Sequence, residues 1–261
     1  MKPTHGQVRW LFVRALALVY LCAFLSLAVQ VDGLIGSRGI LPAQELLGYV
    51  RERTGIERYW LLPTLFWLDA SDGALLLACG GGAALSLALL AGLVPVPVLA
   101  LLWALTLSLA GVGQVFLGYQ WDALLLETGL LAVFFAPGGL RPGVAGEPPR
   151  LPLWLLRWLL FRLMFGSGLV KLASGDPTWR SFSALDYHYW TQPLPTWLGW
   201  YAHQLPSWFQ HASVAAMFGI ELLAPWLVFA GRRARLVAFF PLAGLQLLIA
   251  ATGNYAFFNL L

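Results

Sequence analysis

The chain has 261 residues, of which 59% are hydrophobic and 11% charged, and its mean hydropathy is +0.73. This composition excludes a soluble globular domain and indicates an integral membrane protein. The net charge is +4, but Lys and Arg are spread between apolar runs and form no basic stripe, which argues against nucleic acid as a partner. The lipid bilayer is therefore the first expected partner.

Apolar runs of about 18 to 22 residues recur along the chain, the length that a helix needs to cross a hydrocarbon core of about 30 Å. They predict an all-α, polytopic helical bundle that forms one transmembrane domain over residues 1–261. The seven expected spans are 10–31, 73–91, 95–116, 119–136, 152–173, 212–230 and 235–252. The first run is too long for a signal peptide and precedes six others, so we interpret it as an uncleaved helix.

The positions of Lys and Arg beside short loops predict the orientation, since these residues remain on the cytoplasmic side. Lys2 and Arg9 place the N-terminus inside, together with the basic residues of 232–235. Two long segments are then extracytoplasmic: 32–72 and 174–211.

The first long segment contains LPAQELLGYVRERTG, residues 41–55. Leu46, Leu47 and Val50 recur at helical spacing, and the opposite face is polar. This pattern predicts an amphipathic helix that lies on the membrane surface.

Three charged residues lie deep within the expected spans: Glu127, Arg162 and Glu221. Counted at about 1.5 Å per residue, all three fall at nearly one depth, where the Arg162 guanidinium could bridge both acids. We expect Arg162 to contact at least one of the two carboxylates. Such a layer either locks helix packing or lines a polar cavity for substrate or protons.

Lys171 lies at the outer end of the fifth span, in RLMFGSGLVKLASGDPTWR. Gly166 and Gly168 allow a neighbouring backbone to approach, and a partly desolvated lysine can act as a base. The ordinary alternative is a lysine whose ammonium reaches the lipid headgroups.

The second long segment collects polar aromatic residues in LDYHYWTQPLPTWLGWYAHQLPSWF, residues 185–209. Trp and Tyr at this density are typical of a membrane interface, and the histidines have no zinc-ligand spacing. The two cysteines, Cys22 and Cys79, also lack such spacing. We therefore expect no metal and no cofactor.

A short link separates Lys171 from the DYHY segment, so the two are expected to lie side by side. The candidate site is a polar pocket lined by Lys171, Asp186, His188 and His203 under an aromatic roof.

Three stretches carry a resemblance: YQWDALLLETGLLAVFFAP, FRLMFGSGLVKLASGDPTWRSFSALDYHYWTQPLPTWLGWYAHQLP and IELLAPWLVFAGRR. From about residue 115 to 261 the chain resembles the lipase maturation factor family. The residues that carry the family motif are Trp121, Asp122, Asp176, Trp179, Arg180, Tyr187, Tyr189, Gln192, Pro193 and His203. The resemblance implies a non-enzymatic factor of the endoplasmic reticulum that helps exported lipase clients reach their active fold.

The same region is distantly similar to the membrane domain of vitamin K-dependent carboxylases, in which a comparable lysine is the catalytic base. That resemblance implies an alternative, a membrane enzyme that uses Lys171 on a lipid or quinone-like substrate. Family members continue into a soluble C-terminal domain that is absent from this sequence, so we expect either a fragment of a longer protein or a member that lacks the domain. The composition, rich in Ala, Leu, Gly and Arg, favours a bacterial inner membrane over a reticulum.

Overall fold

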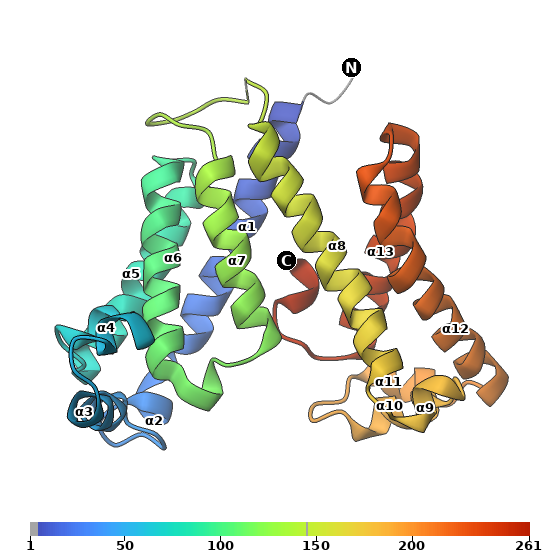
Figure 1. Ribbon diagram of the computed structural model, residues 1–261, viewed down its shortest axis with the longest axis horizontal. Helices are drawn as coiled ribbons and strands as arrows, with labels where there is room; N and C mark the ends of the chain where they lie inside the picture. The colour runs from blue at the N-terminus through green and yellow to red at the C-terminus, as the bar shows by residue number, and fades with distance from the viewer. Residues whose placement is uncertain (1–4, 145) are drawn as a thin grey trace. The chain divides into compact units, whose positions relative to one another are not determined.

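The structure is a computed structural model that describes residues 5–144 and 146–261, so Lys2 of the predicted cytoplasmic N-terminus lies outside the described residues. Within these ranges the chain forms helices and connecting loops, with no β-strand, which confirms the all-α fold. It divides into two compact units, one within residues 1–153 together with Leu261 and one of residues 154–260 (Figure 1).

Six helices of the described chain are long and apolar enough to cross a membrane. They are Gly6–Ala28, Asp72–Leu90, Pro95–Phe116, Arg150–Ala173, Ser207–Phe229 and Arg232–Thr252. These helices lie where six of the seven predicted spans were expected. The remaining predicted span, 119–136, forms a helix of 16 residues, Gln120–Phe135. At about 24 Å this helix is shorter than a hydrocarbon core of about 30 Å.

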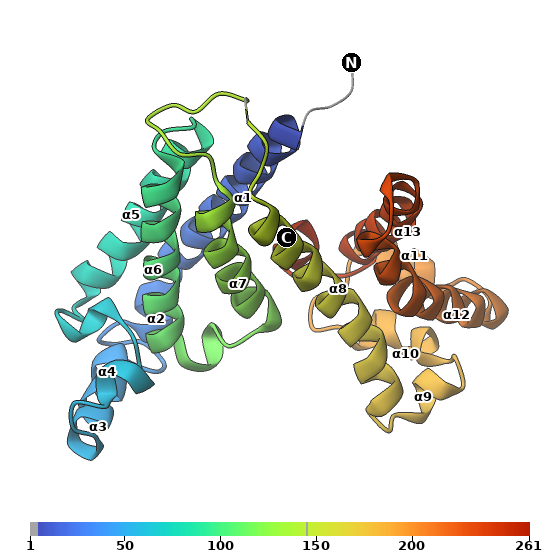
Figure 2. The same cartoon turned by 45° about the horizontal axis from the view of Figure 1, so that its top comes forward.

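The first unit is built around four long helices. Its elements are α1 (His5–Ala28), α2 (Val31–Ile35), α3 (Ala43–Arg53), α4 (Arg58–Leu61), η1 (Leu65–Trp67), α5 (Asp72–Leu90), α6 (Pro95–Gly113), η2 (Gln114–Phe116) and α7 (Gln120–Phe135). α1 packs along α5, α5 on α6, and α6 on α7, which also contacts α1 (Figures 1 and 2).

Glycines allow the closest helix contacts in this unit. A Cβ at Gly82 on α5 would overlap the Phe24 ring on α1, and one at Gly129 on α7 would overlap the Tyr20 hydroxyl. α6 is joined to α7 by the Trp103 indole, whose Nε1 donates to the Leu126 carbonyl at 3.1 Å. Small residues therefore set the spacing of α1 against α5 and α7.

The amphipathic helix predicted within 41–55 is confirmed as α3. Ala43 and Leu47 form its buried face. That face packs against α6, and Gln114 Nε2 donates to the Leu41 carbonyl at 3.0 Å. The apolar stripe therefore contacts protein, while its position on a membrane surface stays a prediction.

The second unit contains three long helices and a series of short ones. Its elements are α8 (Arg150–Ala173), α9 (Pro177–Arg180), α10 (Ala184–Thr191), α11 (Trp197–His203), α12 (Ser207–Leu223), η3 (Ala224–Phe229), α13 (Arg232–Thr252) and η4 (Phe258–Leu260). The boundary between the units falls near the start of α8. Met164 of α8 packs with Val228 of η3 and with Ala238 and Leu242 of α13 in a buried apolar cluster.

The short helices α9, α10 and α11, with their linkers, make up residues 174–206, which we call the cap. α10 packs on α12, and α11 packs on α13. The cap is thus held by the same helices that form the core of the second unit.

Gly82→Ala should lower the stability of the protein by about 1–3 kcal/mol, because the added methyl group overlaps the Phe24 ring. The matched control is Gly81→Ala on the same helix, where a Cβ would meet nothing within 4 Å. That change should stabilise by about 0.5–1 kcal/mol through helix propensity. Thermal unfolding in detergent measures both, and equal shifts for the two variants would contradict the packing of α1 on α5.

Candidate functional site

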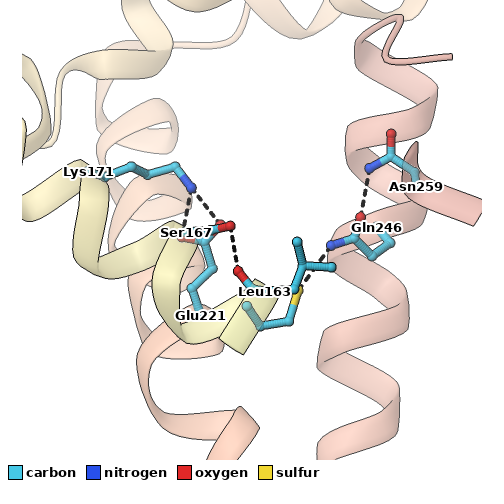
Figure 3. Close-up of polar contacts among 7 residues, drawn as sticks. Leu163, Ser167, Lys171, Glu221, Gln246 and Asn259 are labelled. Atoms are coloured by element: carbon cyan, nitrogen blue, oxygen red, sulfur yellow. Dashed lines mark hydrogen bonds and ion pairs between the residues drawn. The ribbon is translucent and has the colours of Figure 1, made fainter. Parts of the chain in front are cut away.

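An ion pair joins the ends of α8 and α12. Lys171 Nζ donates to both carboxylate oxygens of Glu221, at 2.6 and 2.8 Å (Figure 3). The Glu221 side chain is 3% exposed and that of Lys171 24%. Because an isolated charge at such a buried position is costly, each member supplies the counter-charge that the other requires.

Gly168 brings the two helices close enough for this contact. A Cβ at Gly168 would lie 2.8 Å from Leu222 Cδ2 and 3.1 Å from Glu221 Cβ. The backbone of α8 therefore rests against the side chains of α12 one turn before Lys171. Of the two glycines noted in the sequence, Gly168 makes the close approach, whereas a Cβ at Gly166 would meet nothing within 4 Å.

Trp179 of α9 lies beside the ion pair. Lys171 Nζ is 5.6 Å from its ring centroid, within the range of a cation–π interaction. The same ring packs edge-on against Phe218 of α12 at 6.2 Å. Trp179 thus connects the cap to both the charge and the apolar core of the second unit.

His188 of α10 lies within the electrostatic reach of Lys171. Burial lowers the pKa of His188 below its usual 6.5, and the positive charge of Lys171 lowers it further. Its Nε2 is 3.3 Å from the Tyr255 hydroxyl. Burial also raises the pKa values of Tyr189 and Tyr255 above 10. At neutral pH these three residues are uncharged, and His188 among them lies within the electrostatic reach of Lys171.

Asp186 contacts a histidine that the predicted site does not include. Its Oδ2 is 3.1 Å from His211 Nε2 on α12. The predicted site names His203 and omits His211. His203 lies on α11, and its buried Nδ1 has no hydrogen-bond partner among the described residues.

The linker between α10 and α11 is fixed to the end of α13. Gln192 Nε2 donates to the Thr252 carbonyl at 3.2 Å, and Thr196 Oγ1 donates to the Ala251 carbonyl at 2.9 Å. A Cβ at Gly199 would lie 2.7 Å from the Thr252 carbonyl oxygen, so only glycine fits there. These bonds satisfy carbonyls in the last turn of α13 that the helix itself leaves open.

The outward face of the cap and of the following turn of α12 is aromatic. Six side chains there are between 51% and 88% exposed: Tyr187, Trp190, Trp197, Trp200, Tyr201 and Trp208. Between Arg180 and Arg232 the charged side chains are Asp186 and Glu221, apart from histidines. Beyond Arg180 this face is therefore aromatic and has few charges, as expected for a membrane interface.

The remaining residues of the predicted motif lie at helix starts and on exposed turns. Asp122 Oδ2 accepts from the Tyr119 amide at the start of α7, at 3.1 Å. Asp176 begins α9 and accepts from the Thr178 amide and hydroxyl, and these two bonds lower the pKa of its carboxyl. Trp121 stacks on Tyr119, and Arg180 and Pro193 are exposed.

The predicted charge layer has members on three helices. Glu127 lies on α7, Arg162 on α8 and Glu221 on α12. Glu221 is buried against Lys171, a partner that counting depth along the sequence did not indicate. The expected contact of Arg162 with a carboxylate stays a prediction, as does the polar pocket under the aromatic roof.

Within the described ranges, no three or more His, Cys, Asp or Glu side chains are grouped so that they could hold a metal ion. The arrangement supplies one charge pair, hydrogen-bonding imidazole and phenol groups, and a large aromatic surface.

The fold and the site define an integral membrane protein of the polytopic helical class, with a helical cap fixed to its membrane helices. The family model described as the lipase maturation factor transmembrane domain matches residues 7–261. The chain therefore belongs to the lipase maturation factor family.

Named relatives support this membership. Lipase maturation factor 2 of Rattus norvegicus is 49% identical over 269 residues, which cover 96% of this chain and 38% of that protein. Lipase maturation factor 2 of Homo sapiens is 48% identical over 97% of this chain and 38% of its own length. Lipase maturation factor 1 of Homo sapiens is 37% identical over 98% of this chain and 47% of its own length. The chain thus spans less than half the length of these relatives. No solved structure matches it.

Lys171→Met should destabilise the protein by about 3–5 kcal/mol, because the Glu221 carboxylate is left buried without its partner. The double variant Lys171→Met with Glu221→Met should recover most of this loss, since two apolar side chains replace the pair. Thermal unfolding in detergent, read together with the abundance of each variant in membranes, tests the pair. A single variant as stable as the wild type would show that the ion pair does not hold α8 and α12 together.

Protonation of His188 should destabilise the protein as the pH falls. Its pKa in the folded protein lies below 6.5, so the unfolded chain binds the proton more tightly. This contribution to stability is present above about pH 6.5 and is lost as the pH falls through the lowered pKa. His188→Gln should therefore show a smaller drop in melting temperature between about pH 8 and about pH 5.5 than the wild type. The same drop in melting temperature for the wild type and His188→Gln would contradict a neutral His188.

Proposed function

We propose that this protein assists the folding or assembly of exported lipases or related secreted proteins. The observation that carries the proposal is its membership of the lipase maturation factor family over residues 7–261. Relatives named lipase maturation factor 2 are 47–49% identical in several vertebrates. Because the chain spans less than half their length, we only propose that it shares the activity of those longer proteins.

The proposal assigns client contact to the cap. The cap and the adjoining start of α12 expose four Trp and two Tyr side chains. Hydrogen bonds fix the inward face of the cap to α12 and α13. A rigid aromatic surface loses little conformational entropy when it binds, which suits a factor that must hold incompletely folded clients. Lys171, Asp186, His188 and His203 lie behind that surface as candidates for polar contacts.

The proposal also includes a topology. The N-terminus and residues 137–149 and 231–235 lie in the cytoplasm, and segments 32–72 and 174–211 lie on the opposite side, where exported proteins fold. That compartment is outside the inner membrane in a bacterium, or the lumen of the endoplasmic reticulum in a eukaryote. The named relatives are eukaryotic proteins, whereas the composition of this chain favours the bacterial setting.

The alternative of a carboxylase-like membrane enzyme finds no support in the named relatives, which are lipase maturation factors. The geometry at Lys171 is also unfavourable for it. A base needs a free amine, whereas Lys171 donates to both oxygens of a buried carboxylate, the arrangement of a charged ammonium. We therefore assign Lys171 a structural and binding role.

Cells that lack their own lipase maturation factors test the proposed function. Expression of this chain together with a secreted lipase should raise the activity per unit of secreted lipase protein. The matched control is the chain with Lys171→Met and Glu221→Met, which keeps the helix contact but removes both charges. If the wild-type chain is present at normal abundance and lipase activity does not rise, the proposal is overturned. An equal rise with the wild-type chain and the double variant would show that the ion pair is not part of the site that acts on the lipase.

A further inference from the structure

After α13 the chain turns back along the same helix. Gly253 ends α13 in an extended conformation, Ala256 has a φ of +49°, and η4 (Phe258–Leu260) packs on α13. A left-handed φ is unfavourable for alanine, so the turn at Ala256 is maintained by the contacts around it. Residues 253–260 therefore reverse the direction of the chain instead of leaving the helix bundle.

Two polar contacts hold residues 253–260, one at the cap and one further along α13. Tyr255 bonds with His188 of the cap, with 3.3 Å between Oη and Nε2. Four residues later, Asn259 Nδ2 donates to Gln246 Oε1 on α13 at 2.7 Å (Figure 3). Gln246 Nε2 in turn approaches Met164 Sδ on α8 at 3.3 Å. The segment thus runs from the cap to a point beside the middle part of α13 and α8.

The position of Gln246 gives the depth of this contact. α13 has 21 residues and is about 31 Å long, close to the thickness of a hydrocarbon core. Gln246 precedes Thr252, the last residue of the helix, by six residues, or about 9 Å. Asn259 bonds to Gln246, so it lies at a similar depth below the end of the helix that carries the cap.

The irregular backbone of residues 253–260 is unfavourable in lipid. Two hydrogen bonds of the 3-10 type, from the Phe258 amide to Tyr255 and from the Leu260 amide to Phe257, hold the segment. A helix or a closed barrel satisfies every amide internally, whereas a short turn depends on neighbouring protein or water for part of its backbone. Irregular backbone occurs at membrane depth only where protein covers it or where water reaches it.

The side chains at the lower end of the segment favour water. Each carboxamide has two N–H donors and an oxygen with two lone pairs. One donor of Gln246 is directed at a thioether, which is a weak acceptor. Neither Gln246 nor Asn259 carries a charge, so their remaining hydrogen-bond donors and acceptors suit a neutral hydrogen-bonding molecule rather than an ion.

We propose that water reaches Gln246 and Asn259 from the cap side, so that α8, α13 and residues 253–260 line a hydrated site within the membrane-spanning part of the second unit. The inference does not depend on the proposed function. It gives the polar residues at the cap a continuation into the membrane, through His188 and Tyr255 to the two carboxamides.

Cysteine labelling tests this proposal in the full chain, with Cys22 and Cys79 replaced by Ala. Probe variants are Asn259→Cys and Gln246→Cys. The matched control is Leu247→Cys, because Leu247 is the next residue of α13, lies at the same depth and is 70% exposed on the outside of the helix. Each variant is reconstituted in phosphatidylcholine vesicles and treated with a membrane-impermeant thiol reagent, added on one side at a time.

Both probes should react at least several-fold faster than Leu247→Cys when the reagent has access to the cap, and slowly from the opposite side. All three should react equally after denaturation, and size-exclusion chromatography shows whether each variant is folded. Two probes as slow as Leu247→Cys from both sides would overturn the hydrated site. Fast reaction only from the side opposite the cap would overturn the direction of access.

Discussion

The ion pair between Lys171 and Glu221 is the interaction on which the second unit depends. It joins the last turn of α8 to α12 where both helices are otherwise apolar, and it buries a carboxylate to 3% exposure. The cap begins three residues after Lys171, so the ion pair fixes the end of α8 close to the point where the cap leaves the helix. Trp179 and His188 then lie next to the same charge.

The cap has two faces with different chemistry. Its inward face is joined to α12 through Asp186 and to α13 through Gln192 and Thr196. Its outward face carries aromatic side chains and no Lys or Arg beyond Arg180. Polar bonds fix the inward face, so the aromatic face keeps its shape without burying its own surface. A membrane interface would meet this face as a preformed surface, and so would the clients that we propose.

The segments that form helices could be predicted from the sequence, because membrane-length apolar runs and one amphipathic pattern specify them directly. The runs at 73–91 and 235–252 correspond to α5 (Asp72–Leu90) and α13 (Arg232–Thr252), and the pattern at 41–55 to α3 (Ala43–Arg53). The short link between Lys171 and His188 agrees with the effect of the lysine charge on the pKa of His188, while the predicted pocket stays a prediction. Local patterns were sufficient in each case because the deciding contacts are close in the chain.

The pairing of Glu221 with Lys171 could not be predicted in the same way. Counting depth along upright helices did not indicate it, because Glu221 lies about 21 Å along α12 from Ser207 and Lys171 lies at the end of α8. Such a pairing depends on how two helices cross, which no local pattern encodes. The return of residues 253–260 to Gln246 was missed for a related reason, although a lone Gln in an apolar run was a signal that could have been followed.

The charge state of Glu221 tests the central claim most directly. Infrared difference spectra between the wild type and Glu221→Gln, recorded in lipid at neutral pH, isolate the signal of this one side chain. An ion pair predicts the antisymmetric stretch of an ionised carboxylate, and Lys171→Met should shift that signal. The carbonyl stretch of a protonated acid in the wild-type protein, unchanged by Lys171→Met, would contradict the account.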